Sequence, residues 1–371
     1  MHHMYSGGGQ YTCDCPQDKE IKKNNNAIFF SISDSYTFAV ANVIMGLYQY
    51  SSNMMKTCDV VVYHNGLTQK NQMLLKQLHN EIFFREMVFP EEYNEILNHK
   101  TALIWGPYVV AKFFGFELAN EYDRVLFMDA DLLIRDDISE LFGIEEEMAW
   151  CNILAWNPTE NFKDLLVHPK DYISAGNAGL YYFSGKLRKY NITRSDIVAA
   201  FEKVKSLKRG GSDELVIAWI VYEKGILLKE LERDIYNIPA RRARQDSKIL
   251  HFLDHLKVST KPWRNLAAYL YFADWAENYQ RWIQMGGEGL VQFTQKDYYQ
   301  LFAFDKDKKI GELEAKVKEL KQRVDLDSYN ALEAKYQAVI NSKSWKITAP
   351  LRWLGNIIKR LKKKVKTCFK K

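Results

Sequence analysis

The first third of the chain alternates between short apolar runs and longer stretches with a helical pattern. Residues 27–32, 59–63 and 81–89 are typical of buried strands, whereas residues 36–50 and about 68–78 are typical of helices. Strands that alternate with helices predict an α/β fold, with a mostly parallel sheet flanked by helices. Ligands of such sheets bind beyond the carboxyl ends of the strands.

A later apolar run, residues 124–134, contains two carboxylates at its centre, Asp129 and Asp131. The run predicts a strand buried on both faces, where an unpaired carboxylate is costly to desolvate. Because residues i and i+2 of a strand share a face, we expect both side chains to converge on one cation, with Ala130 small between them. Oxygen ligands favour Mg²⁺ or Mn²⁺ over Zn²⁺. A solvated Asp-x-Asp loop is the alternative.

Charge and cysteine usage narrow the class of protein. The five cysteines among 371 residues show no framework spacing, which favours a reducing compartment. The net charge of +6 is concentrated at the C-terminus, because residues 343–371 contain eleven Lys or Arg and no Asp or Glu. The remaining chain is net negative, so a nucleic-acid groove on its body is not expected.

Polar side chains follow the first predicted strand. Ser31, Ser33, Asp34 and Tyr36 lie where a parallel sheet binds its ligands. A polar, aromatic turn at this place can hold a nucleobase and its ribose. Capping of the following helix explains the same residues equally well.

Two further segments carry candidate binding groups. In Asn177-Ala178-Gly179, the small residues permit close backbone approach to a ligand, and the amide both donates and accepts. Asp213 and Glu214 follow Ser212, an arrangement that helix capping alone also explains.

Residues 249–263 combine an apolar strand that ends in His251 with the sequence Lys261-Pro262-Trp263. One histidine and two carboxylates leave room for further oxygen ligands and favour Mn²⁺. A purely structural histidine is the alternative.

The order of these motifs resembles family 8 of the glycosyltransferases, the glycogenin-like retaining enzymes of the GT-A fold. The resemblance rests on Val-Leu-Phe-Met-Asp-Ala-Asp (125–131), on Asn177-Ala178-Gly179 and on His-Phe…Lys-Pro-Trp (251–263). It implies a metal-dependent transferase with a Rossmann-like GT-A catalytic domain at residues 27–265. The reaction implied is transfer of a hexose, glucose or galactose, from a UDP-sugar to a glycan or lipid-linked oligosaccharide. Residues 342–352 resemble a tail motif of bacterial surface-polysaccharide glycosyltransferases, which implies a role in surface polysaccharide synthesis.

The resemblance also implies roles for individual residues. Asp129, Asp131 and His251 would bind Mn²⁺, with Mg²⁺ as the alternative ion. The implied donor contacts are Ser31, Ser33, Asp34, Tyr36, Lys112, Asp129, Ala130, Ala178, Gly179, Lys257 and Lys261. For the diphosphate, spacing favours Lys257 and sequence context favours Lys261, and we prefer Lys261. The implied catalytic residues are Asn177, Asp213 and Glu214, and Glu214 stands where the family has Gln.

The segments on either side of residues 27–265 have different patterns. Residues 1–26 read as a disordered leader without a signal peptide, and residues 266–308 as an aromatic-rich helical segment. Residues 309–341 contain a short coiled-coil-like stripe, which suits a homodimer through residues 310–340. Residues 342–371 form a basic amphipathic tail suited to an anionic membrane surface, so we expect a cytoplasmic protein peripheral to the inner face of the membrane.

Two other classes of function stay open. An inverting transferase would use Asp213 or Glu214 as a base. A non-catalytic, membrane-associated glycan-binding protein would show no metal dependence.

Overall fold

The computed structural model describes residues 22–152, 158–166, 173–207, 211–255, 258–297, 310–311, 313–318 and 326–341. The chain divides into two compact units, Met1–Val291 and Gln292–Lys371. In the second unit, residues 310–311, 313–318 and α14 (Leu326–Asn341) are helical. The predicted basic tail lies outside the described residues, as does the leader up to residue 21. None of the described helices is long and apolar enough to cross a membrane.

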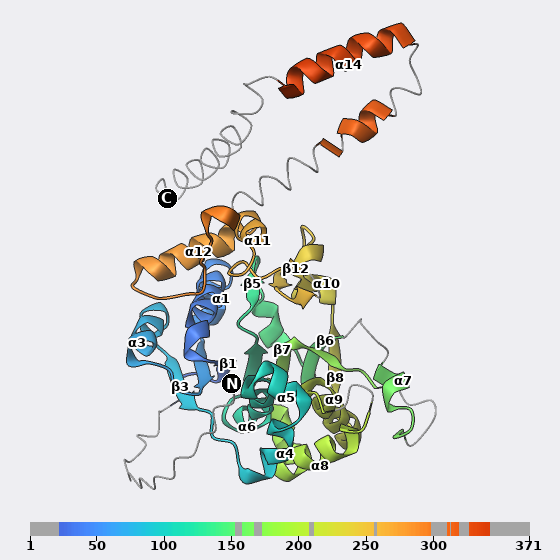
Figure 1. Ribbon diagram of the computed structural model, residues 1–371. Coiled ribbons are helices and arrows are strands. Elements are labelled where there is room, and N and C mark those ends of the chain that lie inside the picture. The colour runs from blue at the N-terminus through green and yellow to red at the C-terminus, as the bar shows by residue number, and fades with distance from the viewer. Residues whose placement is uncertain are drawn as a thin grey trace, which may run out of the picture. The chain divides into compact units, whose positions relative to one another are not determined.

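The first unit is built on a central sheet (Figure 1). Its strands are β1 (Asn26–Ile32), β2 (Cys58–His64), β3 (Ile82–Glu86), β4 (Arg124–Met128), β6 (Met148–Asn152), β7 (Gly176–Ser184) and β8 (Leu228–Leu231). In the described part of the chain, these seven strands are ordered β3-β2-β1-β4-β7-β6-β8. All neighbours are parallel except β7, which is antiparallel to β4 and β6. The predicted α/β fold with a mostly parallel sheet is therefore confirmed.

Helices cover both faces of this sheet. Side chains alternate along β1, so that Ile28 and Phe30 belong to one core cluster, and Ala27 and Phe29 to the other. The first cluster includes residues of α1 (Thr37–Tyr50), α3 (Gln69–Leu78), α11 (Leu266–Tyr271) and α12 (Ala273–Gln284). The second includes residues of α4 (Asn94–Leu97), α5 (Lys100–Trp105), α6 (Phe114–Glu121), α8 (Arg194–Val204) and α9 (Asp213–Lys224).

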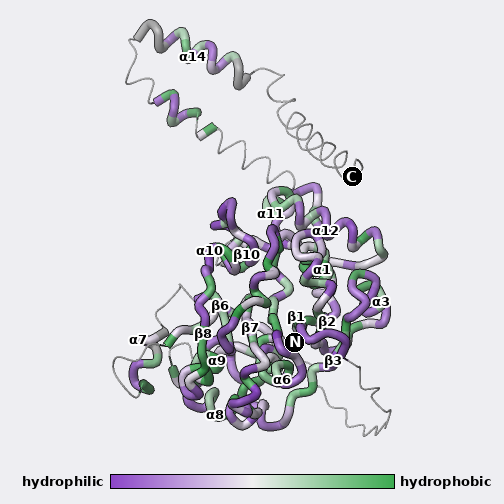
Figure 2. Tube along the Cα trace, turned by 180° about the vertical axis from the view of Figure 1, so that it is seen from behind, coloured by the Kyte–Doolittle hydropathy of each residue, from purple (hydrophilic) through white to green (hydrophobic). Residues whose placement is uncertain are grey.

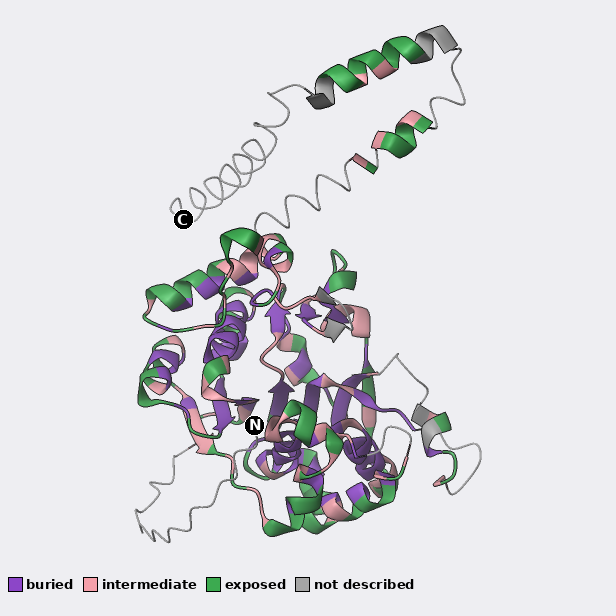
Figure 3. Ribbon diagram, in the orientation of Figure 1, coloured by how far each residue is buried: buried purple, intermediate pink, exposed green. Residues whose placement is uncertain are grey.

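The residues of the central sheet are more buried than those of the helices around it. Figure 3 shows buried strands at the centre and exposed residues on the outer helices, and Figure 2 shows much hydrophilic sequence on the peripheral helices α3 and α8. The remaining short α-helices are α2 (Ser52–Met55), α7 (Pro158–Phe162) and α10 (Arg233–Tyr236). The 3₁₀ helices are η1 (Asp34–Tyr36), η2 (Glu91–Tyr93), η3 (Pro107–Phe113), η4 (Ser139–Gly143), η5 (Gly185–Tyr190) and η6 (Ala240–Arg242).

A small second sheet adjoins the main one. It consists of β5 (Leu132–Ile134), β10 (Ile249–His251) and β9 (Ile238–Pro239), with β10 at its centre. A separate two-stranded pair is formed by β11 (Asp254–His255) and β12 (Val258–Ser259). In the sequence β9 and β10 follow β8, and β10 brings the predicted ligand His251 beside β5.

The sequence-based prediction of one continuous strand over residues 124–134 was wrong. The run forms β4 in the main sheet and β5 in the small sheet, joined by a turn at residues 129–131. The Asp129 backbone N–H donates to the Gly179 carbonyl in β7 at 3.0 Å, and the Phe252 N–H donates to the Asp131 carbonyl at 2.9 Å. The two aspartates therefore converge from a turn anchored to both sheets, and not from alternate positions of one strand.

Three smaller predictions also differ from the structure. The sequence of residues 108–118 predicts one helix, but the segment divides into η3 and α6, after Gly106 with its φ of +80° and Pro107 have ended α5. The third strand ends at Glu86 instead of residue 89. The family resemblance implies a turn at Asn177-Ala178-Gly179, but these residues lie within β7, near its start.

Candidate active site

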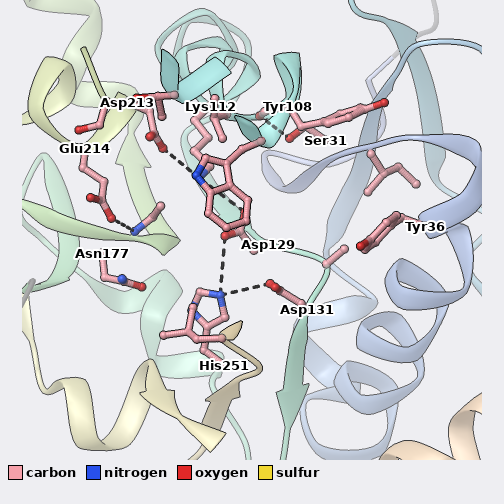
Figure 4. Close-up of a pocket in the computed structure, with 18 of the residues that line it drawn as sticks. Ser31, Tyr36, Tyr108, Lys112, Asp129, Asp131, Asn177, Asp213, Glu214 and His251 are labelled. Atoms are coloured by element: carbon pink, nitrogen blue, oxygen red, sulfur yellow. Dashed lines mark hydrogen bonds and ion pairs between the residues drawn. The ribbon is translucent and has the colours of Figure 1, made fainter. Parts of the chain in front are cut away.

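A cavity of 680 Å³ opens beyond the carboxyl ends of β1 and β4. Most of the residues singled out from the sequence line it, and Figure 4 shows ten of the lining residues with labels. The predicted residues in its wall are Ser31, Ser33, Tyr36, Lys112, Asp129, Ala130, Asp131, Asn177, Ala178, Asp213, Glu214, His251 and Lys261. Asp34 and Gly179 do not line the cavity, and Lys257 lies outside the described residues.

Three of these side chains form a compact cluster of candidate metal ligands. Asp129, Asp131 and His251 each offer one ligand atom, and these atoms lie within 4.8 Å of one another. His251 Nε2 is 3.2 Å from Asp131 Oδ1 and 3.9 Å from Asp129 Oδ2. The aspartates come from the turn between the sheets, and His251 from the end of β10, which pairs antiparallel with β5.

This donor set suits a divalent cation. Two carboxylate oxygens and one imidazole nitrogen, all facing one point at the edge of a cavity, are ligands that Mn²⁺ accepts. Burial raises the pKa of the Asp129 carboxyl, and Lys112 offsets this only in part. Burial alone would also raise the pKa of Asp131, but His251 and Lys261 hold it below its usual range. The residues present therefore fit the metal that the sequence predicted.

Lys112 connects the cluster to the opposite wall of the cavity. Its side chain extends from η3, is 4% exposed, and places Nζ 2.9 Å from Asp213 Oδ2 and 3.7 Å from Asp129 Oδ1. Burial would lower the pKa of Lys112, but the two aspartates raise it above its usual range. A lysine that could have been a solvated helix residue is thus a buried cation between two carboxylates.

Asp213 and Glu214 begin α9, where Ser212 accepts a hydrogen bond from the Leu215 N–H as the predicted N-cap. Capping does not account for the acids themselves, because both face the cavity. Glu214 Oε1 accepts from the Ala178 N–H at 3.1 Å. Burial and the neighbouring Asp213 raise the pKa of Glu214 to about 8, so that Glu214 is mainly protonated at neutral pH.

The other end of the cavity begins after β1. Ser31 Oγ donates to the Tyr108 carbonyl at 2.9 Å, and the Tyr36 ring stands edge-on to the Trp263 ring at 6.1 Å. Asp34 points elsewhere: its carboxylate accepts from the Thr68 backbone N–H and the Asn71 side chain at the start of α3, both at 2.8 Å. Asp34 therefore ties α3 to the turn after β1.

The structure brings Lys261 to the cluster. Its Nζ lies 3.0 Å from Asp131 Oδ2, and the Trp263 ring lies below the same ammonium group at 5.5 Å. Lys261, the lysine that the Lys-Pro-Trp context favours, therefore lies at the candidate metal cluster.

Sequence reasoning missed several residues of the site. Asn237, just before β9, accepts at Oδ1 from His251 Nδ1 at 2.8 Å and donates from Nδ2 to Asn177 Oδ1 at 2.9 Å. Lys100, Thr101 and Trp105 of α5 also line the cavity. No local sequence pattern marks these four positions, because each depends on contacts between distant segments. Gly179, which the sequence did single out, gives His251 its space, because a Cβ there would lie 2.6 Å from the histidine ring.

Comparisons with known proteins agree with this architecture. The family model "Glycosyl transferase family 8" matches residues 27–267. No curated protein matches the chain in sequence. The galactosyltransferase LgtC, solved with donor and acceptor sugar analogues, is 16% identical with a TM-score of 0.50, over 73% of this chain and 98% of LgtC.

Two further solved structures are similar. An active-site mutant of LgtC is 17% identical with a TM-score of 0.51, over 73% of this chain and 98% of that one. The bifunctional glycosyltransferase WbbM is 17% identical with a TM-score of 0.50, over 75% of this chain and 52% of WbbM, so the chain spans about half of WbbM. At these identities the likeness shows the fold alone.

The fold and the family match together define a glycosyltransferase of the GT-A fold. Because the family model covers well over half of its length, the chain belongs to glycosyltransferase family 8.

Proposed function

We propose that this glycosyltransferase uses a UDP-hexose, with glucose or galactose as the sugar, and transfers the hexose with retention of anomeric configuration. The observation that carries the proposal is the convergence of Asp129, Asp131 and His251 in one cavity beyond the strand ends. The acceptor that we propose is a glycan or lipid-linked oligosaccharide in surface polysaccharide synthesis.

The donor would lie along the cavity from β1 to α9. Ser31, Ser33 and Tyr36 would hold the uridine, as the family resemblance implies, with Ala130 leaving space above the turn. When bound at Asp129, Asp131 and His251, Mn²⁺ would supply Lewis-acid stabilisation of the diphosphate leaving group. Lys261, already beside Asp131, would add a fixed positive charge where the leaving group becomes negative.

The sugar would lie between Asn177 and the start of α9. Asp213 pairs with Lys112 at 2.9 Å, and its carboxylate would stabilise positive charge that develops at the anomeric carbon. Glu214, mainly protonated at neutral pH, can donate a hydrogen bond to a sugar hydroxyl. For retention, the acceptor would attack from the leaving-group face, and the departing diphosphate would take its proton.

A panel of nucleotide sugars tests this proposal. Donor hydrolysis and thermal stabilisation are measured with UDP-glucose, UDP-galactose, UDP-N-acetylglucosamine and GDP-mannose, each with Mn²⁺, with Mg²⁺ and with EDTA. We expect Mn²⁺-dependent turnover of one UDP-hexose. Binding of no nucleotide under any metal condition would exclude the proposal and favour a glycan-binding protein.

The inverting alternative has one observation in its favour. A carboxyl with a pKa near neutrality, such as Glu214, is suited to general-base chemistry. The anomeric configuration of the first transferred product, read by proton NMR, separates the two cases. If the product has the inverted configuration and its rate of formation rises as Glu214 ionises, the reaction is inverting and the retaining proposal is wrong.

The acceptor would enter over α5. Trp105 is 61% exposed although it lines the cavity, which makes its ring available to a ligand at the mouth. We expect Trp105→Ala to raise the KM for the acceptor about tenfold through loss of ring stacking. Initial rates at varied acceptor and donor measure this effect.

Leu103→Ala is the matched control, because Leu103 is an exposed residue of the same helix that does not line the cavity. A rise in the donor KM alone for Trp105→Ala would place the indole at the donor instead.

The basic tail would hold the enzyme at an anionic membrane surface on the cytoplasmic side, and residues 310–340 would support a homodimer. The helical state of 310–311, 313–318 and α14 is compatible with the second idea. Both rest on the sequence pattern, as do the domain boundaries at residues 26, 265, 308 and 341.

A further inference from the structure

Asn237 is a buried amide placed between the metal cluster and the sugar end of the cavity. Its side chain is 1% exposed, and it contacts His251 on one side and Asn177 on the other. The backbone fixes this position, because β9 begins at the next residue and pairs in parallel with β10, so that Leu250 lies opposite Ile238. Asn237 itself does not line the cavity.

Asn237 accepts a hydrogen bond in one of these two contacts and donates one in the other. Its Oδ1 can only accept, so the 2.8 Å contact requires a proton on His251 Nδ1. Its Nδ2 can only donate, so the 2.9 Å contact occupies Asn177 Oδ1. The result is a chain of hydrogen bonds with one direction, from His251 through Asn237 to Asn177.

Each end of this chain has a consequence in the cavity. With Nδ1 engaged by Asn237, Nε2 is the ring nitrogen of His251 that faces the carboxylates of Asp129 and Asp131, so it is the nitrogen that a cation bound there would meet. Asn177 Oδ1 also accepts from the Gly179 N–H at 3.4 Å, so the carbonyl of this amide is engaged. Among the described residues, Asn177 Nδ2 has no acceptor, which leaves a donor for a ligand in the cavity.

Little space remains for water to replace Asn237. A Cβ at Gly179 would lie 2.6 Å from His251 Nδ1 and 3.1 Å from Asn237 Oδ1, so the β7 backbone closes this side. A buried polar group without a partner is costly. Loss of the amide would therefore leave His251 Nδ1 unpaired instead of hydrated.

We propose that Asn237 is a positioning residue that sets the hydrogen-bond direction of this chain and thereby prepares two groups at once. It holds His251 Nε2 as the acceptor for a divalent cation, and it presents the Asn177 amide as a donor to a sugar hydroxyl. The inference rests on the proposed function for the identity of both ligands.

Two variants separate this role from simple packing. Asn237→Leu keeps the approximate size and removes both hydrogen bonds, whereas Asn237→Asp keeps an acceptor for His251 Nδ1 and removes the donor to Asn177. Calorimetric titration with Mn²⁺ in the presence of UDP gives the metal affinity. Donor hydrolysis at saturating Mn²⁺ gives kcat and KM.

We expect Asn237→Leu to weaken Mn²⁺ binding about 10- to 100-fold, as is usual for a lost partner of a ligating histidine. Asn237→Asp should keep the Mn²⁺ affinity within about threefold, yet lower kcat about tenfold because Asn177 loses its orientation. Equal loss of affinity in both variants would show that packing alone matters. Unchanged affinity in Asn237→Leu would also overturn the proposal.

The wild-type protein provides a test that needs no variant. Nitrogen-15 NMR of the histidines, with His251→Gln used for assignment, reports which ring nitrogen carries the proton. We expect a proton on Nδ1 of His251 both before and after addition of Mg²⁺. An unprotonated Nδ1, with the proton on Nε2 before Mg²⁺ is added, would mean that His251 does not donate to Asn237. This result would contradict the proposal.

These outcomes are distinct from failure of the proposed function. If the wild-type protein binds neither Mn²⁺ nor UDP, the proposed function fails, whereas the histidine tautomer still tests the hydrogen-bond chain by itself.

Discussion

Asp131→Asn is expected to lower kcat/KM for the proposed Mn²⁺-dependent reaction about a thousandfold or more. The amide keeps the shape of the side chain but removes the negative charge that faces both His251 and Lys261. A missing charge of this kind costs several kcal/mol of transition-state stabilisation, and each 1.36 kcal/mol is about tenfold in rate. Steady-state donor hydrolysis and transfer, measured over a Mn²⁺ titration, give this effect.

Asp123→Asn is the matched control for this experiment. Asp123 precedes the same strand β4 at its other end, is exposed, and pairs with Arg188 at 3.2 Å. The control should behave as the wild type in the same Mn²⁺ titration. Full activity of Asp131→Asn at the wild-type Mn²⁺ concentration would remove this carboxylate from the metal site.

Lys112→Met should cause the largest loss of stability among substitutions in the cavity wall. It leaves Asp213 and Asp129 without their buried cation, and breaking such a pair typically costs about 3–5 kcal/mol. Addition of Asp213→Asn should recover part of the loss, because one of the two uncompensated charges is then removed. Urea denaturation of the single and double variants measures the free energy of unfolding.

Arg85→Met offers a comparison with a more exposed ion pair. Arg85 pairs with Glu121 at 2.6 Å, and the side chains are 27% and 42% exposed. Its loss should cost less than about 1 kcal/mol, as is usual for surface pairs. If Lys112→Met cost no more than Arg85→Met, the buried lysine would not be the counter-charge that the geometry indicates.

Much of the fold was predictable because it depends on local patterns. β1, β2, α1 and α3 form close to their predicted ranges, since each has an apolar period that suits only one kind of element. The division of residues 124–134 into two strands was not predictable in this way. Val125–Phe127 and Leu132–Ile134 are equally apolar, and only pairing with β7 and β10 shows that they belong to different sheets.

The site was predictable where chemistry is concentrated in short motifs. Asp129, Asp131, His251 and Lys261 all face one cavity, as expected from their residue types and motif context. Asn237 could not be recognised, because a single asparagine before a two-residue strand has no distinguishing pattern. Its importance arises from the pairing of β9 with β10.

Asp34 is a residue that the sequence singled out but whose contacts it did not predict. Its position after β1 made both a ligand contact and a helix cap reasonable. The hydrogen bonds from the Thr68 backbone and the Asn71 side chain show instead that Asp34 anchors the start of α3, whose N-cap is Thr68.

The turn at residues 129–131 joins the main sheet to the small sheet, and two of the three candidate ligands lie in it while the third ends β10. A cation bound there would cross-link the two sheets, whose strands are hydrogen-bonded separately, as a disulfide links two loops. Its binding free energy would then add to the cohesion of the folded chain, by RT ln(1 + [L]/Kd). Heat resistance of this enzyme would consequently follow the supply of free divalent cation in its surroundings.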